Sequence, residues 1–152
     1  DYGKNPKDYQ AAPIKITFRY EIPDYALRGE GEMFFRPMVM NNLYNQVRSY
    51  IWIDTSVENR KYGFKDGCSR LVELDETIQL PAGYKLVSAA KDETMQGVGA
   101  DFEGSLVQKG NKVLLHNRLA LKKRVYEASD WESFRNAVNA HKAYGEYLVI
   151  KK

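Results

Sequence analysis

One cysteine and two histidines are the residues of this sequence that suit nucleophilic catalysis. Cys68 with His116 or His141 and an aspartate would form a thiol-hydrolase triad, in which an oriented imidazole activates a thiolate. No predicted helix begins beside Cys68 to favour the thiolate. His116 falls on the charged face of a predicted strand, and His141 on the apolar side of a predicted helix, where a packed histidine is the usual outcome. We therefore predict no catalytic residues and a protein that is not an enzyme.

The same residue types show no spacing typical of a metal site. The sequence has two histidines, at positions 116 and 141, and one cysteine, at position 68. These positions do not match the ligand spacing of a zinc site. DETMQGVGADFEG (residues 92–104) is acidic and rich in glycine, but it lacks the alternating oxygen ligands and the closing glutamate of an EF-hand loop. We interpret it as a loop, and we expect neither a metal ion nor a cofactor.

Two further groups of side chains could form a binding surface. Strand alternation predicts a basic stripe able to meet an acidic partner or an anionic polymer, made of Lys112, His116, Arg118, Lys122 and Arg124. The alternative is the ordinary solvated outer face of a sheet. Tyr50 and Trp52 share one side of another predicted strand, where they could stack on sugar rings or pack in the core.

Alternating polar and apolar residues predict the strands that would position these groups. PIKITFRYEI (residues 13–22) has isoleucines and aromatic residues on one face and mostly charged residues on the other, as in a half-buried strand. Pro37 marks an edge or a break in the next strand. After the strand over 69–80, Pro81 and Gly83 predict a turn. The further predicted strands cover residues 29–40, 46–54, 69–80 and 146–152.

Residues 101–126 predict a β-hairpin. The Gly-Asn pair at 110–111 suits a two-residue turn, so residues whose numbers add up to 221 should face one another. Leu106 would then pair with Leu115, and Phe102 with Leu119. Alternation independently gathers the apolar residues of the second strand on one face, namely Val113, Leu115, Leu119 and Leu121.

One helix is predicted near the end of the chain, with Ser129 as N-cap and Glu132 completing a capping box. Gly145 can end it. Many strands and one late helix predict a mainly β fold, specifically an antiparallel β-sandwich of immunoglobulin-like or jelly-roll-like type. We expect a linker, or the tail of a preceding module, over residues 1–11 and a single β-sandwich domain over 12–152. The helix positions expected to face the core are Trp131, Phe134, Val138 and His141.

Length and charge limit the remaining possibilities. The 152 residues are enough for one well-buried core. A net charge of +3, from 23 basic and 20 acidic residues, is too small to indicate nucleic-acid binding. No apolar run approaches the length of a membrane span, and the polar opening DYGKNPKDYQ shows no signal peptide. The single cysteine excludes a disulfide within the chain.

Several stretches occur in an order that is shared with a known family. They are RKYGF, ETIQLPAGYKL, a hairpin, VYEASDWESFR and EYLVIKK. This order resembles the C-terminal domain of unknown function that follows the transglutaminase-like core in exported proteins of Gram-negative bacteria. The individual matches are Leu80, Pro81, Gly83 and Tyr84 in a turn, then Tyr126, Phe134 and Arg135, and finally Leu148, Val149, Ile150, Lys151 and Lys152.

The resemblance implies a β-sandwich attached to a papain-like Cys-His-Asp module that this chain does not contain, in a protein of the periplasm or cell surface. It implies a non-catalytic accessory domain that packs on or presents that module, or contacts a partner. The alternative is a free-standing module that binds a polysaccharide or an envelope protein. Such a module would use Tyr50 and Trp52 or the basic stripe.

Overall fold

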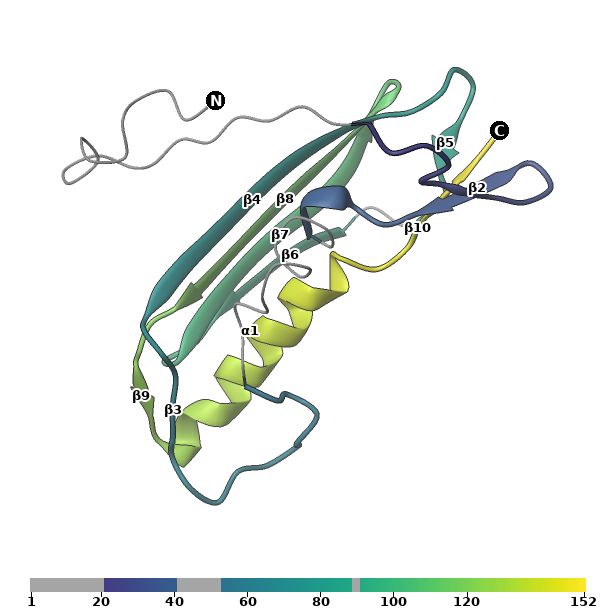
Figure 1. Ribbon diagram of the computed structural model, residues 1–152. Helices are drawn as coiled ribbons and strands as arrows, with labels where there is room; N and C mark the ends of the chain where they lie inside the picture. The colour runs from purple at the N-terminus through teal and green to yellow at the C-terminus, as the bar shows by residue number, and fades with distance from the viewer. Residues whose placement is uncertain (1–20, 41–52, 89–90) are drawn as a thin grey trace, which may run out of the picture.

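The structure is a computed structural model that describes residues 21–40, 53–88 and 91–152. It consists mainly of antiparallel strands, with one α-helix near the C-terminus (Figure 1). The predicted strands over 13–22 and 46–54 lie almost wholly outside the described residues, and Tyr50 and Trp52 lie outside them entirely. No helix in the described part of the chain is long and apolar enough to cross a membrane.

The main sheet has the strand order β4-β8-β7-β6. Its members are β4 (Arg70–Gln79), β8 (Lys112–Leu121), β7 (Ala100–Lys109) and β6 (Lys91–Gln96). The predicted hairpin is confirmed, because Leu106 lies opposite Leu115 and Phe102 opposite Leu119. Gly110 has a φ of 61°, which glycine adopts without strain.

The interpretation of the acidic stretch over 92–104 as a loop is wrong. Residues 92–96 belong to β6 and pair antiparallel with β7. The physical reason is that glutamate and aspartate are tolerated at an exposed edge, where they keep other strands from pairing. The change of direction is confined to residues 97–99.

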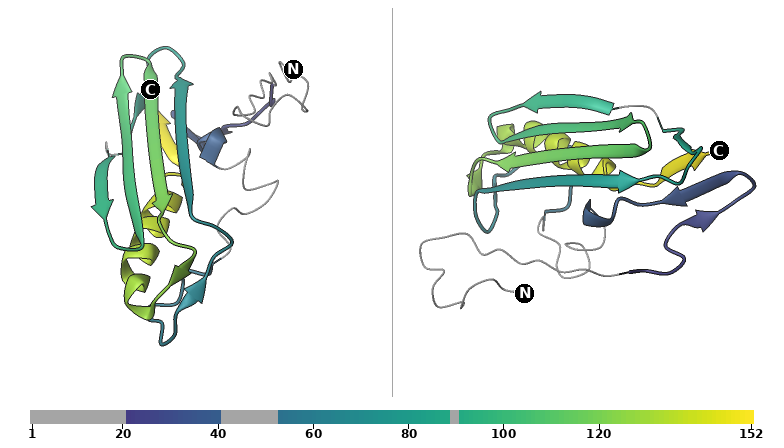
Figure 2. Two further views of the ribbon diagram at one scale, coloured as in Figure 1. Left: turned by 90° about the vertical axis from the view of Figure 1, so that its left-hand side faces the viewer. Right: turned by 90° about the horizontal axis from the view of Figure 1, so that it is seen from above.

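The inner face of the main sheet is covered by α1 (Trp131–Ala143), which crosses β7 and β8 (Figures 1 and 2). The predicted apolar face of β8 is confirmed, because Val113, Leu115, Leu119 and Leu121 are all buried. The predicted core positions of the helix are also buried, from Trp131 to His141. A mainly β, antiparallel fold with one short helix is therefore confirmed, but the described residues place a helix rather than a second sheet against this face.

Two smaller sheets flank this layer. One has the order β1-β2-β10-β5, formed by β1 (Leu27–Arg28), β2 (Glu32–Phe35), β10 (Leu148–Lys151) and β5 (Lys85–Leu86). As predicted, β2 ends before Pro37 and a turn at Pro81–Tyr84 follows β4, with Gly83 at a φ of 83°. The other sheet pairs β3 (Phe64–Lys65) with β9 (Val125–Tyr126).

The helix begins differently from the prediction. A 3₁₀ turn over Ala128–Asp130 precedes α1, so Ser129 lies inside this turn and the capping box with Glu132 is wrong. Instead, the Asp130 carboxylate accepts a hydrogen bond from the backbone N–H of Glu127 at 2.9 Å. Glu127 and Asp130 thus form a capping box two residues before the predicted one, and Lys123 also binds the Asp130 carboxylate.

Candidate functional site

The outer face of the main sheet carries three members of the predicted basic stripe. Lys112, His116 and Arg118 alternate with the buried residues of β8 and therefore point away from α1. Lys122 and Arg124 follow the end of the strand. The Lys122 side chain turns toward the β6–β7 connection, where it binds Asp101 at 2.7 Å and donates to the carbonyl of Gly97 at 2.9 Å.

Acidic residues stand on both sides of this stripe. Arg118 lies opposite Glu73 on β4 and opposite Glu103 on β7. His116 lies opposite Asp75, and the two side chains form a hydrogen bond of 2.7 Å. Neighbouring cations bound to carboxylates attract a further anion only weakly, because each positive charge is already offset nearby. The structure therefore places a mixed-charge surface at this position of the sheet.

Cys68 is exposed in the connection that leads to β4 and forms a hydrogen bond with neither histidine. His141 is buried against β8, where its Nδ1 hydrogen-bonds to the side-chain oxygen of Asn117. Asn117 in turn donates to the His141 carbonyl at 3.3 Å. Burial lowers the pKa of His141 to about 4, so its imidazole is neutral at pH 7 and holds the helix against the sheet.

Four aromatic rings pack together at the first turns of α1, which we call the foot of the helix. Phe64 stacks on Tyr126 with ring centroids 4.7 Å apart, and both rings meet the edges of Phe134. Trp131 completes the cluster, and the Arg60 guanidinium lies 4.4 Å above its ring. Two of the stretches that carry the family resemblance therefore meet at one point of the fold, RKYGF through Phe64 and VYEASDWESFR through Tyr126 and Phe134.

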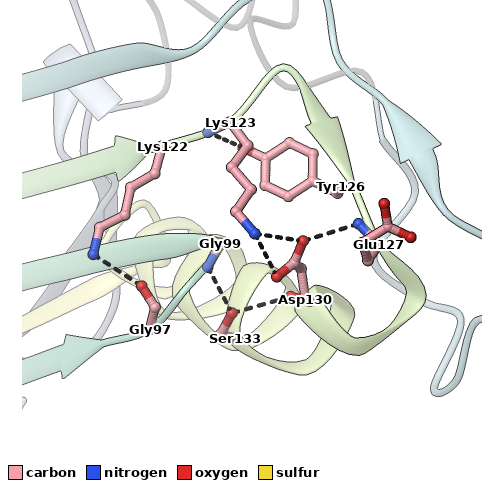
Figure 3. A network of polar contacts seen from close by, with 8 residues as sticks. All are labelled: Gly97, Gly99, Lys122, Lys123, Tyr126, Glu127, Asp130 and Ser133. Atoms are coloured by element: carbon pink, nitrogen blue, oxygen red, sulfur yellow. Dashed lines mark hydrogen bonds and ion pairs between the residues drawn. The ribbon is translucent and has the colours of Figure 1, made fainter.

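Polar contacts surround this cluster (Figure 3). Lys123 binds the Asp130 carboxylate at 2.8 and 2.9 Å, and this bond together with the Glu127 N–H holds the pKa of Asp130 below its ordinary value. The Ser133 hydroxyl accepts from the N–H of Gly99 and donates to the Asp130 carbonyl. These bonds tie the β6–β7 connection and the end of β8 to the foot of α1.

Close backbone approach explains the glycine at position 97. A Cβ built on Gly97 would lie 2.4 Å from the Cβ of Ser133, a distance that real side chains do not reach. A larger residue there would force the β6–β7 connection away from the helix. Gly97 is thus a requirement of this junction rather than a sign of a free loop.

Two grooves open on either side of the foot of α1. One has a volume of about 430 Å³ and is lined by residues that include Arg60, Trp131 and Arg135. The other has a volume of about 730 Å³ and includes Val98, which is 70% exposed at the tip of the β6–β7 connection. Ser129, Glu132 and Asn136 contribute to both grooves. This end of the molecule thus combines concave surface with an exposed apolar side chain.

The sequence patterns do not predict that this region forms a surface, although they predict several of the residues that build it. Trp131 and Phe134 were expected as core on the basis of helical spacing, and Val98 was placed in a loop. The signal available was the concentration of aromatic residues in RKYGF and VYEASDWESF, but their meeting depends on the pairing of β3 with β9. That pairing spans about sixty residues of chain and has no local signature.

A comparison against protein families identifies the family of this chain. The model of the domain of unknown function with a solved structure, DUF3858, matches residues 31–149. The chain belongs to the DUF3858 family. The match spans all four strands of the main sheet, the helix and its foot. No curated protein matches this DUF3858 chain.

Among solved structures, the DUF3858 chain is similar to a protein from Parabacteroides distasonis whose crystal structure at 2.00 Å is described as that of a candidate protease. The TM-score is 0.56 and the identity is 13%, so the similarity concerns the fold alone. The alignment covers 64% of this chain and 20% of the Parabacteroides chain. This chain therefore spans about a fifth of its structural relative.

Proposed function

We propose that this chain is a non-catalytic accessory domain at the C-terminal end of a longer, transglutaminase-like protein of the cell envelope. Its role would be to pack on or present the catalytic module, or to contact a partner. The observation that carries the proposal is the alignment of its fold with 20% of a much longer chain described as a candidate protease. The placement of Cys68 apart from both histidines in the described residues also supports it.

The order of family motifs supports the finer parts of the proposal. The transglutaminase-like core, the export to the periplasm or cell surface and the β-sandwich all follow from the resemblance. A sandwich requires a second layer of strands beyond those described against the main sheet. The sequence of the longer protein would therefore test the transglutaminase-like core and the export directly.

We propose the foot of α1 as the surface that meets the catalytic module. It offers two grooves and Val98, and stable interfaces bury apolar side chains at a well-packed centre with a polar rim. The contacts beneath it, from Lys123 to Asp130 and from Ser133 to Gly99, make this surface rigid. A rigid surface loses little conformational entropy on binding.

The first experiment is to read the coding region upstream of Asp1. A signal peptide followed by a Cys-His-Asp module of papain-like arrangement would support the accessory role. A start codon directly before Asp1, or an unrelated domain, would contradict it. Turnover by this chain alone that is lost in Cys68→Ser would also contradict it.

The second experiment tests the contact surface in the longer protein. Val98→Asp introduces a charge at the foot of α1, whereas Val87→Asp makes the same change at a residue that is 54% exposed beside β5, toward the opposite end of the main sheet (Figure 1). We expect Val98→Asp to separate thermal unfolding of the two modules into two transitions, and Val87→Asp to leave a single transition. Equal effects of the two variants would exclude this surface.

The alternative is a free-standing module that binds a polysaccharide or an envelope protein. Trp131 is 2% exposed and should be protected from a soluble quencher, so any quenchable tryptophan fluorescence would come from Trp52. A Trp52→Phe variant that loses no quenchable fluorescence would exclude Trp52 as a sugar-stacking residue. Loss of that signal, together with a start codon before Asp1, would favour the alternative.

A further inference from the structure

Three metal-binding side chains meet on the outer face of the main sheet. Glu73 and Asp75 lie two residues apart on β4 and therefore point to the same side. His116 is the residue of β8 directly opposite Asp75. One ligand atom from each of the three residues lies within 4.8 Å of the others.

The backbone around this triad is held on both sides. β4 pairs with β8 over ten residue pairs, and β8 pairs with β7 over ten more. Side chains opposite one another in such a ladder have Cβ atoms about 5 Å apart, and residues i and i+2 are about 7 Å apart. The side chains of Glu73 and His116 are long enough to close these gaps. The ligands are thus placed by the sheet rather than by a loop.

The donor atoms are also available. In the described part of the chain, Glu73 forms no ion pair or hydrogen bond through its carboxylate. Asp75 forms one bond, to His116, and the second carboxylate oxygen has no partner there. Arg118 lies opposite Glu73, but it also lies opposite Glu103 and can pair with that residue instead.

We propose that Glu73, Asp75 and His116 form a site for a divalent transition-metal ion, with Zn²⁺ as the best chemical fit. Imidazole nitrogens and carboxylate oxygens are both ligands of Zn²⁺, whereas Ca²⁺ and Mg²⁺ prefer oxygen ligands alone. Two carboxylates neutralise the charge of the ion. The bound ion replaces the hydrogen bond between Asp75 and His116, and its fourth position faces solvent, where water completes the tetrahedron.

The test is a calorimetric titration of the full chain with zinc sulfate, with Mg²⁺ and Ca²⁺ in parallel. We expect one saturable zinc site per chain, with the affinity reduced at least about tenfold in Glu73→Gln and in His116→Ala. The matched control is Glu103→Gln, because Glu103 faces Arg118 from the other side and loses the same charge. Its zinc affinity should equal that of the unmodified chain.

A second readout locates the ion. Zinc should shift the ring nitrogen resonances of His116 and leave those of the buried His141 unchanged. Circular dichroism of each variant should match that of the unmodified chain, because all three substitutions lie on the outer face of the sheet. Equal weakening by Glu73→Gln and Glu103→Gln, no effect of His116→Ala, or a shift of His141 alone would overturn the proposal. The same holds for binding that no variant alters.

Discussion

At the scale of single residues, the Tyr144 hydroxyl is buried without a hydrogen-bond partner in the described part of the chain. Burial raises the pKa of Tyr144 to about 12, with further contributions from Glu93 and Asp92. Tyr144→Phe removes the unpaired group and keeps the ring against Phe102. We expect the free energy of unfolding in urea to stay constant or rise by up to about 1 kcal/mol.

Tyr126→Phe is the matched control for this prediction. The Tyr126 hydroxyl accepts a hydrogen bond from the backbone N–H of Lys123 at 3.3 Å, and the residue is fully buried. Its removal should therefore lower the free energy of unfolding by about 0.5–1.5 kcal/mol. If both variants lose stability equally, the Tyr144 hydroxyl has a partner in solution.

His141 should make stability depend on pH. Burial, with a smaller effect of the Lys142 charge, lowers its pKa from 6.5 to about 4. The unfolded chain then binds a proton more readily than the folded chain between these values. This contribution to stability is fully present above pH 6.5 and is lost as the pH falls toward 4. The loss should be on the order of 3 kcal/mol across this range.

The measurement is the free energy of unfolding from pH 4 to 7 for the unmodified chain and for His141→Gln. Glu76 acts in the opposite direction, because burial raises its pKa and favours the folded state as the pH falls. Glu76 is present in both proteins, so its effect cancels in the difference. A difference between the two proteins that does not change with pH would show that His141 does not titrate as described.

At the scale of elements, the foot of α1 depends on the ion pair between Lys123 and Asp130. Asp130 is 4% exposed and binds Lys123 and the Glu127 N–H. Asp130→Ala should lower the free energy of unfolding by about 2–3 kcal/mol, because it leaves these donors unpaired. The surface pair of Arg36 and Glu146 provides the comparison, and Glu146→Ala should change stability by less than about 0.5 kcal/mol. Equal losses in urea unfolding would show that the buried pair contributes nothing beyond a surface pair.

At the scale of the whole molecule, the sheets should differ in local stability. β8 is paired on both sides and covered by α1, whereas β1 and β5 are two-residue edge strands of the smaller sheet. Amide hydrogen exchange should therefore be slowest in β8 and much faster in β1 and β5. Exchange at equal rates in β8 and β5 would mean that the two sheets open together.

The sequence by itself determined the elements whose periodicity is local. The alternation of β8 and the Gly-Asn turn were sufficient to predict which residues of the hairpin pair, and helical spacing was sufficient to predict that Phe134 and His141 are buried. The local pattern did not predict how the helix begins. Ser129 has the residue type of an N-cap, but the capping box forms two residues earlier, between Glu127 and Asp130, whose carboxylate Lys123 also binds.

The tertiary structure alone decided which surfaces form. The aromatic foot joins Phe64 to Tyr126 through the pairing of β3 with β9. The register of β4 against β8 brings Asp75 to His116, which turns part of a predicted basic stripe into a triad with Glu73. Strand periodicity specifies the face on which a side chain lies, whereas its neighbours depend on strand order and register, which are set by packing across the whole molecule.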